Sequence, residues 1–181
     1  KKYYEPQTKL ERTINVPFCP ESVLSGVEYK DFMEAVWYQR EFTVPEKFAD
    51  LRTILHFGAV DYKATVYVNG KEVGTHKGGY ISFEFDITDY LNGGTNVLTV
   101  YAEDDTRNPL QSRGKQSEEY YSHDCDYTRT TGIWQTVWLE FVPESRIKNI
   151  KVFPNVKNCS VDIQAEVTGA GKFEALALYQ E

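Results

Sequence analysis

The chain has 181 residues and a formal net charge of −7, and 41% of its residues are apolar and 14% aromatic. No run of 18 apolar residues is present, so the sequence excludes a membrane-spanning helix, and the acidic balance argues against binding to duplex nucleic acid. Residues with β-branched or aromatic side chains far outnumber Ala, Leu and Met, which predicts a mostly β protein. The chain begins at Lys1 without a signal-peptide pattern, so we expect a soluble excised or processed piece, with its compartment left open.

The three cysteines, Cys19, Cys125 and Cys159, are widely spaced and include no CxxC pair. A structural zinc site needs clustered ligands, so this spacing does not favour one. One disulfide with a free thiol and three free thiols are equally compatible with the pattern. We therefore expect no metal or cofactor in the chain itself.

Short apolar segments separated by turn signals run through most of the chain. The first of these segments ends at Pro45 and the last strong one ends at Pro143. Between the third and the fourth, Asn69-Gly70 is the sequence signature of a two-residue hairpin turn. We expect strands at residues 36–44, 52–57, 64–68, 71–75, 81–87, 96–103 and 133–142.

Two of these segments indicate how the sheets are covered. From Ile81 to Ile87 apolar and polar residues alternate, which predicts a strand with one wet face. Residues 96–103 are largely apolar on both faces, so we expect that strand to be central. A turn spacing of about ten residues is typical of an antiparallel β-sandwich, which we expect over residues 1–143.

Residues 104–131 break this rhythm, because they show neither strand nor helix periodicity. The segment from Glu103 to Asp126 alone holds more than half of the net negative charge. A structureless connection of this length inside a compact domain is usually functional or disordered. The tyrosines in it, Tyr120, Tyr121 and Tyr127, favour a shaped loop, and we expect a functional site here.

After Pro143 the pattern changes to three further short segments, at residues 147–153, 160–167 and 173–179. Residues 144–181 are too few to bury the core of an independent domain. We expect them to be the first strands of a second β-domain that the end of the chain cuts off. Exposed edge strands of this kind invite pairing with another molecule.

Four motifs, in order along the chain, give it a specific resemblance. They are FGAVDYKATVYVNG at residues 57–70, THKGGY at 75–80, FEFDIT at 83–88 and GIWQTVWLE at 132–140. Together they resemble the N-terminal sugar-binding domain of glycoside hydrolase family 2, a family of β-galactosidases, β-glucuronidases and β-mannosidases. The resemblance implies a jelly-roll (galactose-binding-domain-like) antiparallel β-sandwich, with residues 144–181 as the start of an immunoglobulin-like domain.

The resemblance also bears on whether the chain is itself an enzyme. Retaining glycoside hydrolysis needs two carboxyl groups about 5 Å apart. In the family both lie on a (β/α)₈ barrel, which this sequence lacks, so the resemblance implies a catalytically inert domain that packs on the barrel of a β-glycosidase. A self-contained hydrolase would instead use Asp124 and Asp126, which share one face if their segment is extended; we do not favour it.

A substrate contact in residues 104–131 is also implied by the resemblance. In several family members an aspartate six residues before a Gly-Ile pair reaches into the sugar pocket of the barrel, directly or through a bound cation. Gly132-Ile133 is the matching pair here, and Asp126 stands six residues before Gly132. The candidate substrate-binding set is Asp126 with its neighbours Tyr127 and Arg129, and Arg113 and Gln116 of an RGKQ run that resembles one branch of the family.

Each member of this set also has a plainer interpretation. Asp126 fits a surface aspartate, Arg129 equally fits a partner that orients Asp126, and residues 113–116 equally fit a solvated loop tip. No catalytic residue and no metal ligand is expected in the chain, although a cation at the sugar site of the full-length enzyme stays open.

Other motif residues are expected to be structural. Asp61 lies just before strand 64–68, where its carboxylate would accept backbone N–H bonds and fix the turn. We expect His76, in a Gly-flanked turn, to be a hydrogen-bonded structural residue rather than a ligand. The indoles of Trp134 and Trp138 are four residues apart and would share one face of a strand, packed in the core.

Three functions compete on this sequence. The first is the non-catalytic N-terminal domain of a retaining family 2 β-glycosidase that lends a loop to the sugar pocket. The second is a stand-alone, lectin-like carbohydrate-binding module, and the third is a structural or adhesion module. The cut-off tail favours the first function. We expect carbohydrate and the barrel as partners, and no nucleic acid or membrane, while the sugar, its linkage and a homo-oligomer stay open.

Overall fold

The computed structural model describes residues 2–176 and 178 of the chain. The chain forms two compact units, Lys1–Phe141 and Val142–Glu181. Strands make up nearly all of the regular secondary structure in the described residues, as the composition predicts, and three short 3₁₀ helices accompany them: η1 (Val23–Ser25), η2 (Glu46–Phe48) and η3 (Thr88–Tyr90). The strands are β1 (Ala35–Thr43), β2 (Arg52–Phe57), β3 (Val60–Asp61), β4 (Lys63–Val68), β5 (Lys71–Lys77), β6 (Phe83–Asp86), β7 (Thr95–Glu103), β8 (Gly132–Ile133), β9 (Val137–Val142), β10 (Arg146–Asn155) and β11 (Ser160–Thr168).

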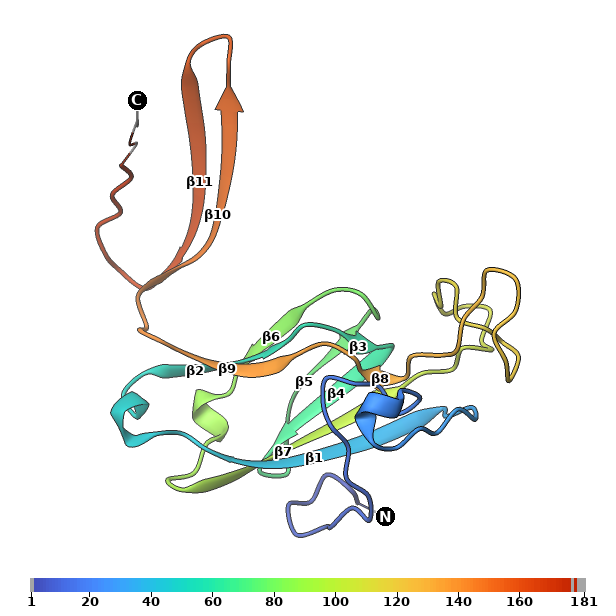
Figure 1. Ribbon diagram of the computed structural model, residues 1–181. Coiled ribbons are helices and arrows are strands. Elements are labelled where there is room, and N and C mark those ends of the chain that lie inside the picture. The colour runs from blue at the N-terminus through green and yellow to red at the C-terminus, as the bar shows by residue number, and fades with distance from the viewer. Residues whose placement is uncertain (1, 177, 179–181) are drawn as a thin grey trace. The chain divides into compact units, whose positions relative to one another are not determined.

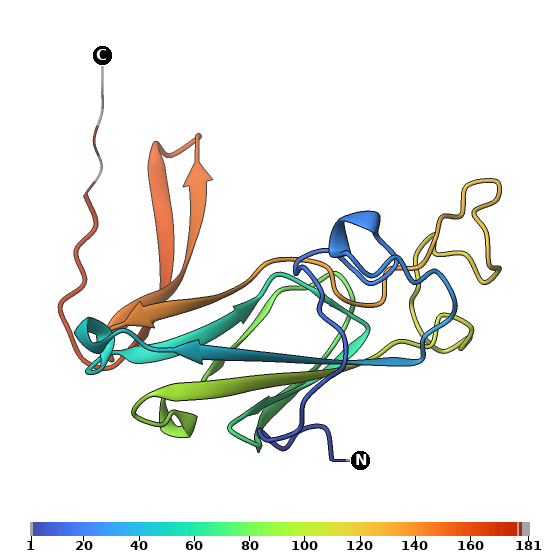
Figure 2. The same ribbon diagram turned by 60° about the horizontal axis from the view of Figure 1, so that its bottom comes forward.

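Two antiparallel sheets form the sandwich of the first unit (Figures 1 and 2). One sheet has the strand order β1-β7-β4-β5 and the other has the order β6-β2-β9, while β3 and β8 form a short separate pair. Strand β7 lies between β1 and β4 and pairs with both along its length, so the expected central position of residues 96–103 is confirmed. An antiparallel β-sandwich is therefore the fold.

The core lies between the two sheets and draws on both. Leu55 and Phe57 of β2 pack with Val66 of β4 and Val100 of β7, all of them fully buried or nearly so. These side chains come from alternate positions of their strands, because successive residues of a strand point to opposite faces. At roughly 1.5–3 kcal/mol for each buried large apolar side chain, this interface is the main source of the unit's stability.

The turn between β4 and β5 forms where the sequence predicts it. Asn69 and Gly70 have φ angles of 53° and 79°, the positive values that a type I′ turn requires. The Asn69 side chain also stabilises the turn from outside the hairpin, because its Oδ1 accepts the Val97 N–H at 2.9 Å and its Nδ2 donates to Tyr90 O at 2.8 Å. The hairpin is thereby fastened to the start of β7.

Two expected strands differ from the observed ones. The expected strand 133–142 is divided into β8 and β9, because the chain leaves the ladder at Trp134, whose indole Nε1–H donates to Gly79 O at 2.8 Å. The expected alternation of buried and exposed side chains holds from Phe83 to Ile87, one residue beyond β6, and fails at Ile81, which is 64% exposed. In both places a contact outside the segment, or solvent, overrides the local periodicity.

The second unit contains one long hairpin. Strands β10 and β11 pair antiparallel from Arg146↔Thr168 to Asn155↔Ser160. The third segment expected in this region, 173–179, has no strand over residues 173–176 and 178, and its residues 177 and 179 lie outside the described part of the chain. Apolar side chains of the hairpin are about half exposed, among them Ile147, Val152 and Val161. A two-stranded hairpin is marginal in water without further strands to cover it.

Candidate functional site

The candidate site is the long connection between β7 and β8, residues 104–131, which we call the Asp126 loop. Figure 1 shows it in yellow to orange at one end of the sandwich. Isolated β-bridges join Gln116 with Tyr127 and His123 with Asp126, so the loop folds back on itself. The expectation of a shaped loop is confirmed.

Asp126 and Tyr127 lie in the outer arm of the loop. The backbone of Asp126 exchanges two hydrogen bonds with that of His123, at 3.1 and 2.7 Å. The Asp126 carboxylate is half-buried, with Cys125 Sγ 3.9 Å from its Oδ1, and Tyr127 is 45% exposed. Tyr127 is exposed and Asp126 is partly exposed, and a carboxylate and a phenol are groups that hydrogen-bond sugar hydroxyls.

The same turn contradicts the geometry needed for a self-contained hydrolase. That interpretation requires an extended segment, so that Asp124 and Asp126 share one face. The reciprocal bonds between His123 and Asp126 instead close a tight turn in which Asp124 has a φ angle of 45°. Residues 124–126 are therefore not extended, and the carboxylate pair is not formed in the expected way.

Tyr80 is a further exposed side chain next to Tyr127, although the sequence analysis did not propose it as a site residue. It is 55% exposed, and its ring meets Trp134 edge-on with the centroids 5.8 Å apart. Partial burial and the neighbouring Tyr127 raise the pKa of Tyr80 above its ordinary value. A Cβ on Gly114 would lie 2.7 Å from the Tyr80 hydroxyl, so the absent side chain at Gly114 makes room for it. The sequence signal that could have pointed to Tyr80 is its position directly after Gly78-Gly79, where the chain turns.

Gln116 is buried, and its polar atoms are bonded within the protein. It is 1% exposed, its Nε2 donates to Asp61 Oδ2 at 2.8 Å, and its Oε1 accepts the Thr130 N–H at 2.6 Å. The side chain therefore joins the loop to β3, and it also interacts with the side chain of Tyr80. The sequence suggested a sugar contact, and the structure shows a link inside the fold.

Arg129 is likewise buried, at 2% exposed. Its guanidinium donates to the backbone carbonyls of Ser117, Glu119 and Lys30 and lies 4.1 Å from the centroid of the Phe32 ring. These bonds tie the two arms of the Asp126 loop to the N-terminal segment. In the described part of the chain Arg129 makes no side-chain hydrogen bond or ion pair with Asp126, and its bonds act on the backbone of the loop.

Arg113 lies at the surface of the loop, apart from the buried network. Its Nη1 donates to Glu118 Oε2 at 2.6 Å, and the two side chains are 30% and 61% exposed. Exposed ion pairs of this kind contribute little to stability. Of the five predicted residues, the structure thus brings Asp126 and Tyr127 together at the surface, buries Gln116 and Arg129 beneath them, and leaves Arg113 in a surface ion pair.

Three buried carboxyl groups lie beneath the loop, and sequence reasoning missed them as a group. Glu21, Asp61 and Asp104 are 4%, 1% and 2% exposed. Burial raises the pKa of Asp61 to about 6 and that of Asp104 to about 7, and it also raises the pKa of Glu21. Hydrogen bonds act in the opposite direction, from Gln116 to Asp61 and from the Thr131 N–H to Glu21 at 3.2 Å. Uncompensated burial disfavours the charged form, and the three negative charges disfavour one another.

Asp61 differs from its expected role. It does not act as a turn residue that accepts backbone N–H bonds, because Oδ2 is bonded to Gln116 and Oδ1 has no hydrogen-bond partner among the described residues. A Cβ on Gly79 would lie 2.3 Å from Asp61 Oδ1, so the glycine makes space for the carboxylate. A single acid between the apolar residues Val60 and Ala64 is the signal that points to a buried carboxyl.

The prediction that Trp134 and Trp138 share one face of a strand in the core is wrong, because Trp134 lies between β8 and β9 and neither indole belongs to the core. Trp138 is 44% exposed and stacks on His56, with the ring centroids 4.8 Å apart, on the outer face of the β6-β2-β9 sheet. Trp134 is half-buried and hydrogen-bonded as described above. His76 is structural as expected, but through stacking on Phe83 at 4.1 Å, since its buried Nε2 has no hydrogen-bond partner in the described part of the chain.

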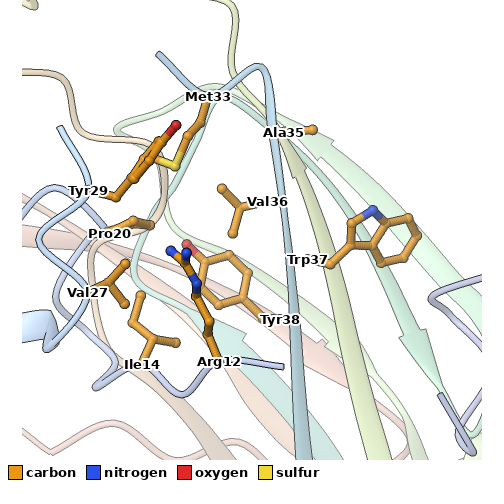
Figure 3. Close-up of a pocket in the computed structure, with 10 residues that line it drawn as sticks. All are labelled: Arg12, Ile14, Pro20, Val27, Tyr29, Met33, Ala35, Val36, Trp37 and Tyr38. Carbon is orange, nitrogen blue, oxygen red and sulfur yellow. The ribbon is translucent and has the colours of Figure 1, made fainter. Parts of the chain in front are cut away.

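A cavity of about 420 Å³ lies elsewhere in the first unit, between the N-terminal segment and β1 (Figure 3). Figure 3 shows Tyr38 and Trp37, neighbours in β1, pointing to opposite sides of the strand. Most of the lining is apolar, including Ile14 and Val36. None of the five predicted site residues lines this cavity, so it is separate from the Asp126 loop.

The cysteine, metal and membrane features of the described residues are simple. Among these, no group of three or more His, Cys, Asp or Glu side chains is arranged to hold a metal ion. The structure contains three free thiols, at Cys19, Cys125 and Cys159, rather than one disulfide with a free thiol. Within residues 2–176 and 178, no helix is long and apolar enough to cross a membrane.

Comparison with known proteins places this geometry in a family. The family model described as "Glycosyl hydrolases family 2, sugar binding domain" matches residues 8–143. A β-galactosidase of Thermoanaerobacter pseudethanolicus is 34% identical over 79% of this chain, which covers 19% of that protein. Human β-glucuronidase is 30% identical over 95% of this chain, which covers 30% of that protein.

Solved structures agree with the sequence relatives. A β-glucuronidase from an uncultured Clostridium species superposes with a TM-score of 0.73 at 30% identity, over 93% of this chain and 30% of its own. A β-glucuronidase of Faecalibacterium prausnitzii gives a TM-score of 0.67 at 26% identity, over 92% of this chain and 32% of its own. The chain thus spans less than a third of the length of the relatives it matches. It belongs to the sugar binding domain of glycosyl hydrolases family 2.

Proposed function

We propose that the chain is the non-catalytic N-terminal domain of a retaining family 2 β-glycosidase and lends the Asp126 loop to that enzyme's sugar pocket. The observation that carries this proposal is a partly exposed Asp126, next to the exposed Tyr127, on a loop fastened by buried bonds. A fixed carboxylate accepts two sugar hydroxyl bonds without first losing much loop entropy. The relatives named β-galactosidase and β-glucuronidase support a β-glycoside as the substrate class.

The partner in this proposal is a (β/α)₈ barrel of the same polypeptide, which would carry both catalytic carboxyl groups. The small share of each relative that the chain covers, 19% and 30%, supports a further catalytic part. The second unit, with its half-exposed hairpin, is in this proposal the start of an immunoglobulin-like domain over residues 144–181. Further strands would cover the apolar side chains of β10 and β11.

The test is Asp126→Ala in the full-length enzyme. Hydrogen bonds from hydroxyls to a carboxylate are worth roughly 1.5–3 kcal/mol each, so kcat/KM for a simple β-glycoside should fall by about 10- to 150-fold for one lost bond. Asp124→Ala is the matched control, because Asp124 lies in the same turn with its side chain 97% exposed. An unchanged kcat/KM for Asp126→Ala would sink the proposal.

Calorimetric titration of the 181-residue chain with the same β-glycoside separates this function from a lectin. A site completed by the barrel predicts no measurable binding at millimolar ligand. Clear binding that Asp126→Ala leaves unchanged would favour a stand-alone carbohydrate-binding module.

A further inference from the structure

The two arms of the Asp126 loop are paired through their backbones beside the proposed sugar contact. Ser117 N–H donates to Tyr127 O at 2.7 Å, and Tyr127 N–H donates to Lys115 O at 2.9 Å. Tyr127 directly follows Asp126 in the chain. The position of Asp126 therefore depends on where residues 115–117 lie.

Gln116 stands at the centre of this paired segment and faces inward. Its amide bonds two separate parts of the fold, Asp61 of β3 through Nε2 and the Thr130 N–H through Oε1. Thr130 belongs to the outgoing arm of the loop, so one side chain holds both arms and connects them to the sandwich. A shift of Gln116 would move all of these attachments together.

Asp61 gives this link a rigid base. Its strand β3 pairs with β8, with Asp61 opposite Gly132. The carboxylate lies against Gly79, where an added Cβ would come within 2.3 Å of Oδ1, and Gly79 O in turn accepts the indole N–H of Trp134 at 2.8 Å. The acceptor of the Gln116 bond is thus fixed by the close packing of three segments.

A buried amide and carboxyl are an unusual choice if stability alone were needed. Burial of polar groups is costly even when they are paired, and an apolar pair of similar volume packs at least as well. What the hydrogen bond adds is a defined orientation, because it fixes both the distance and the direction between the loop and β3. That property is useful for a loop whose outer residue must meet a ligand to within a fraction of an ångström.

We propose that Asp61 and Gln116 are positioning residues, which hold the Asp126 loop in the geometry that presents Asp126 to the sugar. This inference rests on the proposed function. Neither side chain contacts the substrate in this arrangement, since both are buried, and both act through the backbone of residues 115–130.

The experiment is a set of variants in the full-length enzyme. Gln116→Leu removes both amide bonds at similar volume and should lower kcat/KM for a β-glycoside by about 10- to 100-fold. Asp61→Leu should do the same, whereas Asp61→Asn retains an oxygen that accepts the Gln116 bond and should stay within about threefold of wild type. Val68→Ala, at the opposite end of β4 from the loop, is a matched control for general loss of core packing.

The discriminating measurement is Gln116→Leu in an Asp126→Ala background. If Gln116 acts through Asp126, the second substitution should change kcat/KM by less than about twofold. A further fall as large as in the wild-type background would overturn the inference, because it would show a loss independent of Asp126. So would a single Gln116→Leu variant with unchanged kcat/KM.

Amide hydrogen exchange on the 181-residue chain separates failure of this inference from failure of the proposed function. Gln116→Leu should speed exchange at the Tyr127 and Thr130 amides by about tenfold or more while β7 amides stay protected. Retained protection at Tyr127 contradicts the positioning role whatever the activity shows. A different outcome is that Asp126→Ala leaves kcat/KM unchanged while Gln116→Leu removes the protection of the loop amides. That outcome would remove the proposed function and leave the structural link between Gln116 and the loop established.

Discussion

Replacing Asp104 with Asn removes a carboxyl group that titrates inside the protein. Asp104 faces Asp61 and Glu21, and burial together with the charge of Asp61 raises its pKa from 3.8 to about 7. Gln111 Nε2 donates to Asp104 Oδ1 at 2.5 Å, and asparagine keeps an oxygen for that bond. The substitution therefore removes the titration with little change in shape.

The sign of the effect follows from proton binding in the two states. Between about pH 4 and pH 7 the folded chain holds a proton on Asp104 that the unfolded chain has released, so the free energy of unfolding falls as pH rises through this window. At about 1.4 kcal/mol for each unit of pKa, a rise from 3.8 to about 7 costs roughly 4 kcal/mol at neutral pH. Part of this belongs to Asp61, because the two groups titrate as a coupled pair.

The assay is urea unfolding of the 181-residue chain, followed by tryptophan fluorescence at several pH values. As the pH rises from about 4.5 to 7.5, the free energy of unfolding of Asp104→Asn should increase by about 3 kcal/mol relative to that of wild type. The difference between the two urea midpoints should grow accordingly, at constant m-value. Taking the difference between the two proteins cancels the titrating groups that do not interact with Asp104. Asp124→Asn is the matched control, since Asp124 has the same chemistry at an exposed position. A difference between Asp104→Asn and wild type that stays constant with pH would refute the reasoning.

Three further substitutions test the packing around the Asp126 loop, each measured by the urea midpoint. Gly79→Ala should cost about 1–3 kcal/mol, because the new Cβ would lie 2.3 Å from Asp61 Oδ1, while Gly93→Ala, with no atom within 4 Å, should be nearly neutral. Arg129→Met should cost about 2–4 kcal/mol and speed proteolysis of the loop, because it leaves backbone carbonyls without their charged donor. Gly70→Val should cost about 1–2 kcal/mol, because a β-branched residue is strained at a φ angle of 79°. A neutral result for any of the three would show that the local contact is relaxed at little cost.

The sequence by itself determined the features that depend on neighbours along the chain. The hairpin at Asn69-Gly70 follows from the φ angles these two residues tolerate, and the central place of β7 follows from its two apolar faces. The family follows from four short motifs in a set order, which the match over residues 8–143 confirms. Each of these signals is contained within a few residues.

Tertiary structure alone decided which polar residues are buried. Gln116 and Arg129 stand in a polar stretch that resembles a solvated loop, yet their partners lie far away in sequence, at Asp61 and Lys30. The break after β8 has the same origin, since the indole of Trp134 bonds Gly79 across the fold. Burial and pKa depend on groups that only folding brings together. No local pattern therefore distinguishes the partly exposed Asp126 from the buried Asp104 at the start of the same loop.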